Sequence, residues 1–145
     1  MKMRKLVNHR RNRIRAAVLG AAAASICAMA PLPIANADDP YLVGTWSGHR
    51  ERIASTEGYR NGEATLVVTE QTGWTFKGSL SRTTPDGDVS DPLVGAFSPD
   101  GTIITGSDDE GTYSFKLVDP VTLDYCYSEH GPGYRTTCAR LQRQS

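Results

Sequence analysis

The stretch Leu-Asp-Tyr-Cys-Tyr-Ser-Glu-His-Gly-Pro-Gly-Tyr-Arg-Thr-Thr-Cys-Ala-Arg-Leu, residues 123–141, is typical of a β-hairpin. Glycine tolerates positive φ and proline presets a bend, so Gly131-Pro132-Gly133 predicts the turn. A hairpin centred on Pro132 opposes three pairs of residues: Cys126 and Cys138, Ser128 and Thr136, and Asp124 and Arg140. Directly opposed residues on antiparallel strands have Cβ atoms close enough to bridge. We therefore predict a Cys126–Cys138 disulfide and a cross-strand ion pair.

The first 37 residues have the layout of a secretory signal peptide. A basic segment ends at Arg15, an Ala-rich apolar segment runs over residues 16–30, and Ala35-Asn36-Ala37 is an A-x-A cleavage site. A membrane anchor is the alternative, but two prolines interrupt the apolar run before it reaches the roughly 20 residues that a span needs. We expect cleavage before Asp38 and a mature domain over residues 38–145 that is secreted or lies in the periplasm or cell envelope.

Removal of this segment makes the remaining chain acidic. The 145 residues include 16 basic and 16 acidic ones, and residues 1–37 hold seven of the basic and none of the acidic residues. Residues 38–145 therefore have 9 basic against 16 acidic residues, a formal net charge of −7. This excess favours solubility and argues against nucleic acid or an anionic membrane surface as a partner. The two cysteines that remain suit an oxidising compartment.

The mature chain has the pattern of short strands separated by turn residues, with no helical period. In residues 73–83, for example, Trp74, Phe76 and Leu80 alternate with polar residues, which is the pattern of a half-buried strand. We expect six strands before the opening hairpin, at residues 44–52, 62–70, 73–83, 93–98, 102–107 and 112–118. With the two arms of the hairpin, the chain predicts an all-β fold, a single eight-stranded antiparallel up-and-down barrel.

In a barrel of this size the inward side chains nearly fill the interior or enclose one small ligand. The inward set that we expect is apolar and largely aromatic: Trp46, Leu66, Val68, Trp74, Phe76, Leu80, Tyr113, Phe115, Tyr125 and Tyr127.

Gly44-Thr45-Trp46 on the first strand, with Arg140 on the last, resembles the Gly-x-Trp…Arg signature of the calycins. That superfamily includes lipocalins, fatty-acid-binding proteins and avidins, and the chain is also similar to the small barrel inhibitors of bacterial metalloproteases. The resemblance implies that Trp46 plugs one end of the barrel and that Arg140 packs across its ring, which a cation–π interaction favours. Ser47, Gly48 and His49 do not match the polar run that holds biotin in avidins, so the resemblance implies the fold and no biotin site.

Residue patterns for catalysis or metal binding are weak in this chain. His49 and His130 are the two histidines of the mature chain, and no Gly-x-Ser-x-Gly nucleophile motif accompanies them. Residues 86–90 have oxygens at alternate positions, as a calcium loop does, but Phe97 stands where that loop needs a bidentate acid. Solvated histidines and a solvated turn are the interpretations that we favour, so we expect no enzymatic activity, metal or cofactor.

The inward aromatic residues are either a filled core or the lining of a pocket. A buried tyrosine needs a partner for its hydroxyl, so three inward tyrosines favour a wet or ligand-lined end. We predict a secreted, non-enzymatic barrel that binds a small, partly apolar or aromatic molecule through Trp74, Tyr113, Tyr125 and Tyr127. The alternative is a protein-binding barrel, such as an inhibitor of an extracellular or periplasmic protease. A ligand carrier should have a concave pocket among the inward residues, whereas an inhibitor should have a filled barrel and an exposed apolar patch or projecting segment.

Overall fold

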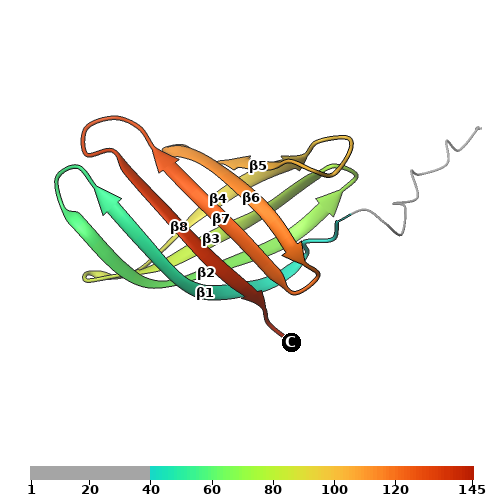
Figure 1. Ribbon diagram of the computed structural model, residues 1–145, viewed down its shortest axis with the longest axis horizontal. Coiled ribbons are helices and arrows are strands. Elements are labelled where there is room, and N and C mark those ends of the chain that lie inside the picture. The colour runs from blue at the N-terminus through green and yellow to red at the C-terminus, as the bar shows by residue number, and fades with distance from the viewer. Residues whose placement is uncertain (1–39) are drawn as a thin grey trace, which may run out of the picture. The chain divides into compact units, whose positions relative to one another are not determined.

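The structure, a computed structural model, describes residues 40–145; the predicted signal peptide and its cleavage site lie outside the described residues. Eight β-strands account for most of this part of the chain (Figure 1): β1 (Gly44–Ala54), β2 (Gly58–Thr72), β3 (Thr75–Thr84), β4 (Gly87–Phe97), β5 (Ile104–Ser107), β6 (Gly111–Asp119), β7 (Thr122–Glu129) and β8 (Arg135–Arg143). Over residues 40–145, no helix is long and apolar enough to cross a membrane.

The strands close into one antiparallel barrel in sequence order, with β8 pairing back to β1. The predicted all-β class, strand number and up-and-down connectivity are confirmed. Successive turns in such a meander alternate between the two ends of the barrel. The β1–β2, β3–β4, β5–β6 and β7–β8 turns therefore share one end, which we call the mouth, and Figure 1 shows the first, second and last of them together at the left.

The hairpin of β7 and β8 has the predicted register. Cys126 is opposite Cys138, Ser128 is opposite Thr136 and Asp124 is opposite Arg140. The turn between the strands contains two glycines with positive φ, Gly131 and Gly133, as the turn chemistry requires. Cys126 and Cys138 are joined by a disulfide, with their Cα atoms 4.1 Å apart.

The core fills the barrel with alternate residues from every strand, and nine of the ten predicted inward residues are buried. The exception is Trp74, whose predicted inward orientation is wrong. It lies in the turn between β2 and β3 and is 52% exposed. Because the strand begins at Thr75, Trp74 is not part of the pleat that orients Phe76 and Leu80 inward.

Trp46 lies in the core at the end of the barrel opposite the mouth, and the cation over its ring is Arg143, not Arg140 as predicted. Trp46 is fully buried, and its Nε1 donates a hydrogen bond to the carbonyl oxygen of Leu42 at 2.9 Å. The guanidinium carbon of Arg143 lies 4.1 Å from the ring centroid. Side chains alternate along a strand, so Arg140 faces the opposite side of β8, where its Nε donates to Asp124 Oδ1 at 2.7 Å.

The fourth strand begins at Gly87, six residues before the predicted start at Leu93. The polar residues of this first half form the strand because they pair along β3, from Thr84 opposite Gly87 to Gly78 opposite Leu93. On its other side, β4 pairs with β5 over residues 94–97 alone. Within residues 40–145, the first half of β4 is therefore paired along one edge only.

Candidate functional site

Polar side chains enter the barrel at the mouth, where the apolar core ends. Arg50 and Arg52 lie on the inward face of β1, which also carries Trp46, and both are buried. Arg82 lies on the inward face of β3, two residues beyond Leu80. The remaining side chains come from the last three strands and meet these arginines around one small cavity: Tyr113, Tyr125, Tyr127, Arg135 and Thr137. We call this set the Arg–Tyr cluster.

The cavity inside the Arg–Tyr cluster has a volume of about 20 Å³. That is enough for a group slightly larger than one water molecule. A larger groove of about 430 Å³ lies outside it, lined by Arg60 and Asn61 of β2 and by residues 83–85 at the β3–β4 turn. Arg50 and Arg52 line both the cavity and the groove. The two arginines therefore stand at the boundary between the barrel interior and its outer opening.

Two of the three tyrosines have a fixed partner in the β5–β6 turn. The hydroxyl of Tyr113 donates to Asp108 Oδ2 at 2.8 Å, and that of Tyr127 donates to Asp108 Oδ1 at 3.1 Å. Their rings pack with centroids 4.4 Å apart. Burial, reinforced by the charge of Asp108, raises the pKa of both tyrosines, so both are neutral hydrogen-bond donors. These two hydroxyls hold the turn against the cluster.

Tyr125 differs from the other two because its hydroxyl has no hydrogen-bond partner within residues 40–145. The side chain is 2% exposed, and burial raises the pKa of its hydroxyl to about 12. A neutral, buried hydroxyl group therefore faces the cavity with its hydrogen-bonding capacity unused.

Three of the four arginines in the cluster have carboxylate partners. Arg52 pairs with Glu57 of the β1–β2 turn, and Arg82 pairs with Asp91 of β4. Arg135 pairs with Glu129 and, at 3.4 Å, with Glu110. The hydrogen bond from Arg52 lowers the pKa of Glu57, and Asp91 raises the pKa of Arg82 against the opposing effect of burial. The pairs with Glu57 and Glu110 join turns of the mouth to β1 and β8, and the pairs with Asp91 and Glu129 join neighbouring strands.

The predicted lining residues are thus brought together only in part. Tyr113, Tyr125 and Tyr127 meet at the mouth, whereas Trp74 lies near Phe97 and Pro40 at the other end of the barrel. The sequence prediction missed the arginines altogether. Strand parity could have found them, because Arg50 and Arg52 are four and six residues after Trp46, and Arg82 is two residues after Leu80.

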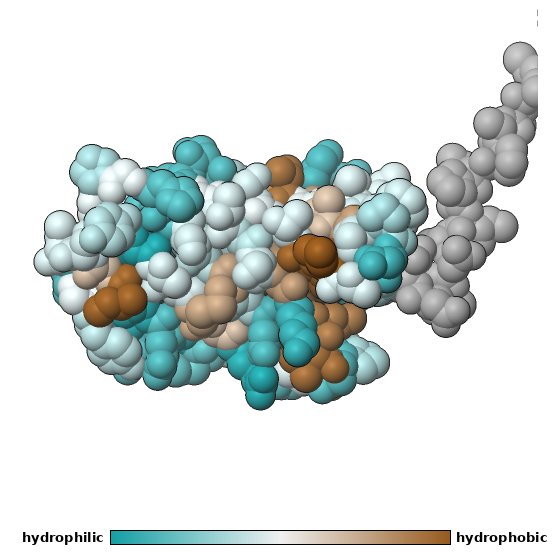
Figure 2. Space-filling view, turned by 45° about the horizontal axis from the view of Figure 1, so that its top comes forward, coloured by the Kyte–Doolittle hydropathy of each residue, from teal (hydrophilic) through white to brown (hydrophobic). Residues whose placement is uncertain are grey.

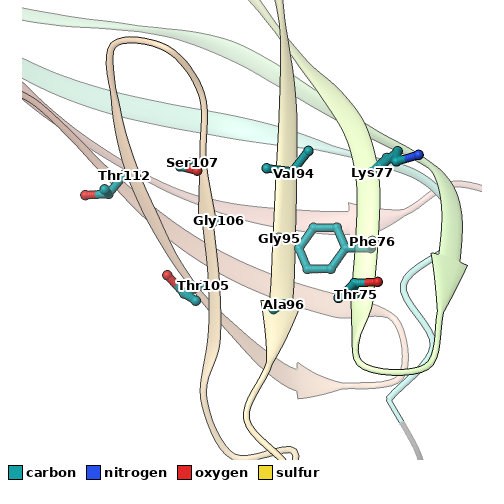
Figure 3. A pocket seen from close by; sticks show the side chains of 10 residues that line it. All are labelled: Thr75, Phe76, Lys77, Val94, Gly95, Ala96, Thr105, Gly106, Ser107 and Thr112. Carbon is teal, nitrogen blue, oxygen red and sulfur yellow. The ribbon is translucent and has the colours of Figure 1, made fainter.

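A second concavity lies on the outer face of the sheet. Figure 3 shows this groove, of about 620 Å³, with residues from β3, β4, β5 and the start of β6 along it. Val94 and Lys77 are exposed beside it, and Gly95 and Gly106 contribute backbone to its floor, since a Cβ atom at either position would point inward, towards Phe76 or Phe115. Figure 2 shows apolar residues on one face of the molecule as separate groups among hydrophilic ones. That face has no single continuous apolar surface.

The two histidines are not associated with a nucleophile. His49 lies 3.4 Å from Glu63 on the exposed face of the barrel, and the hydrogen bonds of residues 40–145 join neither His49 nor His130 to a hydroxyl or thiol. In the same part of the chain, no three His, Cys, Asp or Glu side chains gather as a metal site would require.

Comparison with known proteins supports the fold. No protein-family model and no curated protein matches the chain. Among solved structures, it is similar to a redesigned β-barrel, with a TM-score of 0.54, 15% identity, and coverage of 72% of this chain and 92% of that one. It is also similar to Rv2717c from M. tuberculosis, with a TM-score of 0.50, 16% identity, and coverage of 72% and 93%. Residues 40–145 therefore form a small eight-stranded antiparallel β-barrel.

Proposed function

We propose that the protein is a secreted, non-enzymatic β-barrel that binds a small, partly apolar or aromatic molecule at its mouth. The observation that carries this proposal is the groove of about 430 Å³ that opens onto the Arg–Tyr cluster. Its volume is in the range of small-molecule sites, which combine a concave surface with a few placed polar groups. The cavity behind the groove is too small for a whole ligand. The body of the molecule therefore lies in the groove, and only one of its groups enters the cluster.

Native mass spectrometry of the protein purified from its own host tests this proposal. We expect a retained small-molecule mass that decreases in Tyr125→Phe, because this substitution removes the unused hydroxyl at the cavity. Tyr41→Phe is the matched control, since Tyr41 is exposed and lies before β1, away from the mouth. Equal retention in both variants would place the ligand elsewhere.

Export is part of the proposal and has its own test. The basic and apolar segments before Ala35-Asn36-Ala37 support it, and the disulfide between Cys126 and Cys138 is compatible with an oxidising compartment. N-terminal sequencing of the exported protein should begin at Asp38. Exported material that begins at Met1 would contradict the cleavage.

A protein-binding barrel, such as a protease inhibitor, is the second candidate. Two observations favour it: the barrel interior is nearly filled, and the first half of β4 has an edge that pairs with no other strand of residues 40–145. An unpaired edge can accept an extended segment of a partner. Titration of purified extracellular proteases should then give stoichiometric inhibition. Full protease activity at an excess of the barrel would count against this candidate.

A further inference from the structure

Arg50 is the one arginine of the Arg–Tyr cluster for which no carboxylate of residues 40–145 forms a salt bridge. Its side chain is nearly enclosed, with the residue 4% exposed. The Nη2 atom donates to the carbonyl oxygen of Thr83 at 2.7 Å, whereas Nε and Nη1 have no partner within the described chain. Most of the hydrogen-bonding capacity of a buried guanidinium group is therefore unused.

The surroundings of Arg50 make this arrangement costly for the protein alone. Burial lowers the pKa of Arg50, an effect that Tyr125 opposes and that Arg52, Arg82 and Arg135 reinforce. A buried charge is normally paired, because desolvation otherwise penalises it. A negatively charged group at this position would relieve both the desolvation and the repulsion between the arginines.

The other unused polar atoms at the cavity are suited to the same group. The Tyr125 hydroxyl and Arg52 Nε also lack hydrogen-bond partners within residues 40–145, and both residues line the cavity with Arg50. A guanidinium group offers parallel N–H donors that match the two oxygens of a carboxylate or phosphate group. The cavity therefore combines a cation and further donors with room for about one oxygen of an oxyanionic group, whose other atoms face the groove.

We infer that the mouth binds the oxyanionic group, carboxylate or phosphate, of a small organic molecule, with Arg50 as the principal cation and Tyr125 as a second hydrogen-bond donor. This inference rests on the proposed function, since it names the chemistry of the ligand that the mouth takes. One oxygen of the anionic group enters the cavity between Arg50 and Tyr125, and the remainder of the molecule lies in the adjoining groove.

Isothermal titration calorimetry in low-chloride buffer tests the inference with four probes: benzoate, its neutral isostere benzamide, phenyl phosphate and inorganic phosphate. The purified full chain is used throughout, so that residues 1–37 contribute equally in all variants. We expect benzoate or phenyl phosphate to bind at least about tenfold more tightly than benzamide, because hydrogen bonds to a charged group are stronger than neutral ones. Which of the two binds more tightly tells a carboxylate ligand from a phosphate ligand.

Three variants assign the preference to the site. Arg50→Gln should remove it, and Tyr125→Phe should weaken it several-fold. Arg140→Gln, which removes the same charge from the exposed pair with Asp124, should leave it unchanged. The comparison of benzoate with benzamide uses the wild type alone, so it tests the preference for an anionic group even if Arg50→Gln does not fold.

The outcomes separate this inference from the proposed function. Benzamide that binds as tightly as benzoate, or an anion preference that survives in Arg50→Gln, would overturn the inference and leave a small-molecule site in place. Arg50-dependent binding of inorganic phosphate without any aromatic probe would support the anion site and count against an aromatic ligand. Absence of binding by all four probes at millimolar concentration would overturn both.

Discussion

Arg50 and Arg82 are inward arginines of the mouth that differ in whether a carboxylate accompanies them. Arg50→Met removes an unpaired buried charge, so in anion-free buffer we expect the free energy of unfolding to rise by about 1–2 kcal/mol. Arg82→Met leaves Asp91 without its partner and should lower that free energy by about 1–3 kcal/mol, since the pair is partly exposed. Urea unfolding measures both changes. Destabilisation of equal size in the two variants would show that Arg50 is paired after all.

Trp46, Arg143 and Arg140 should differ in the order of their effects on stability. Trp46→Ala removes a large buried side chain from the core and should cost about 3–5 kcal/mol. Arg143→Ala removes a cation–π contact of about 0.5–2 kcal/mol and the hydrogen bond from Nη1 to the carbonyl oxygen of Val43. Arg140→Ala breaks an exposed, solvent-screened ion pair with Asp124 and should have the smallest effect of the three. Thermal unfolding of the three variants checks this order. If Arg140→Ala lost more stability than Arg143→Ala, the assignment of Arg143 as the cation over Trp46 would be wrong.

Asp108 should make stability depend on pH in the acidic range. Burial alone would raise its pKa, but hydrogen bonds from Tyr113, from the backbone N–H groups of Glu110 and Gly111, and from Tyr127 lower it. The contribution of the ionised carboxylate is therefore complete above the pKa of an unfolded aspartate, about 3.9, and is lost as pH falls through the lower folded value. Asp108→Asn should be less stable than the wild type at pH 7, and the difference should shrink below about pH 4.

Urea midpoints of Asp108→Asn and the wild type, measured from pH 7 to pH 2.5, test this dependence. Asp109→Asn is the matched control, because Asp109 is exposed and forms no hydrogen bond within residues 40–145. A difference between Asp108→Asn and the wild type that stays constant down to pH 2.5 would contradict the role given to Asp108.

Individual residues were predictable from the sequence where strand parity was certain. The inward positions of Trp46, Tyr113 and Tyr125 follow from alternation within strands whose residues were assigned correctly. Trp74 was misplaced because the strand begins at Thr75, two residues after the predicted start at Gly73, and no local pattern separates the last turn residue from the first strand residue. The choice of Arg140 over Arg143 had a different cause. Both are on β8, but they are three residues apart and therefore face opposite sides of the strand; Arg143 lies on the inward face with Leu141, opposite Trp46.

The disulfide joins the two strands of one hairpin, β7 and β8. Cys126 and Cys138 are 12 residues apart in the sequence, and both lie on the exposed face of the barrel. A loop of this length constrains the unfolded chain by about 3 kcal/mol in the chain-entropy model. We expect Cys126→Ser with Cys138→Ser to lower the free energy of unfolding by about 2–3 kcal/mol.

Reduction of the wild type should reproduce the effect of the double substitution, and adding reductant to the double variant should change nothing further. The barrel should remain folded in both cases, because β7 and β8 stay paired with β6 and β1. Free-thiol labelling of both cysteines in the native, oxidised protein would contradict the bond itself.

Turn residues made the position of most strands predictable from the sequence, whereas pairing with a neighbouring strand determined the bounds of the others. Gly-Pro-Gly at 131–133 fixed the hairpin of β7 and β8 because few other conformations suit these residues. The loop before β5 was taken for strand at Thr102, but Asp100 Oδ1 accepts hydrogen bonds from the hydroxyls of Ser98 and Thr102 and from the Thr102 N–H. The first half of β4 has no apolar alternation, so only its pairing with β3 makes it a strand.

On the scale of the whole molecule, the charge is distributed unevenly between outside and inside. Residues 38–145 have a formal net charge of −7, yet four of their nine basic side chains enter the barrel at the mouth. We expect the resulting acidic exterior to favour solubility and to repel polyanions such as nucleic acid. The interior arginines offer a positive site that only a small group can reach. We expect this arrangement, which net charge alone cannot reveal, to favour small anions over large ones.

Closure of the barrel depends on the pairing of β1 with β8, and the backbone of β8 leaves no room for a side chain at Gly48. A Cβ atom at Gly48 would lie 2.1 Å from the carbonyl oxygen of Arg140, so Gly48→Ala must push the strands apart. Overpacking of this kind costs about 1–3 kcal/mol. Gly62→Ala is the matched control, since the nearest atom to its added Cβ would be 3.5 Å away and its φ is ordinary. That substitution should leave stability unchanged or raise it by up to about 1 kcal/mol.

Urea unfolding followed by both tryptophan fluorescence and circular dichroism measures the effect on closure. β1 and β8 come from the two ends of the described chain, and their pairing closes the barrel. If this pairing is lost, Trp46 and Leu141 are exposed together, so the barrel cannot open there and keep its core intact. We therefore expect one transition in each protein, with the two probes coincident, and a lower midpoint only in Gly48→Ala. If the free energy of unfolding of Gly48→Ala depended less steeply on urea concentration than that of the wild type, the barrel of this variant would already be open in the native state. Equal midpoints for Gly48→Ala and Gly62→Ala would show that β1 and β8 are not as closely packed as the structure places them.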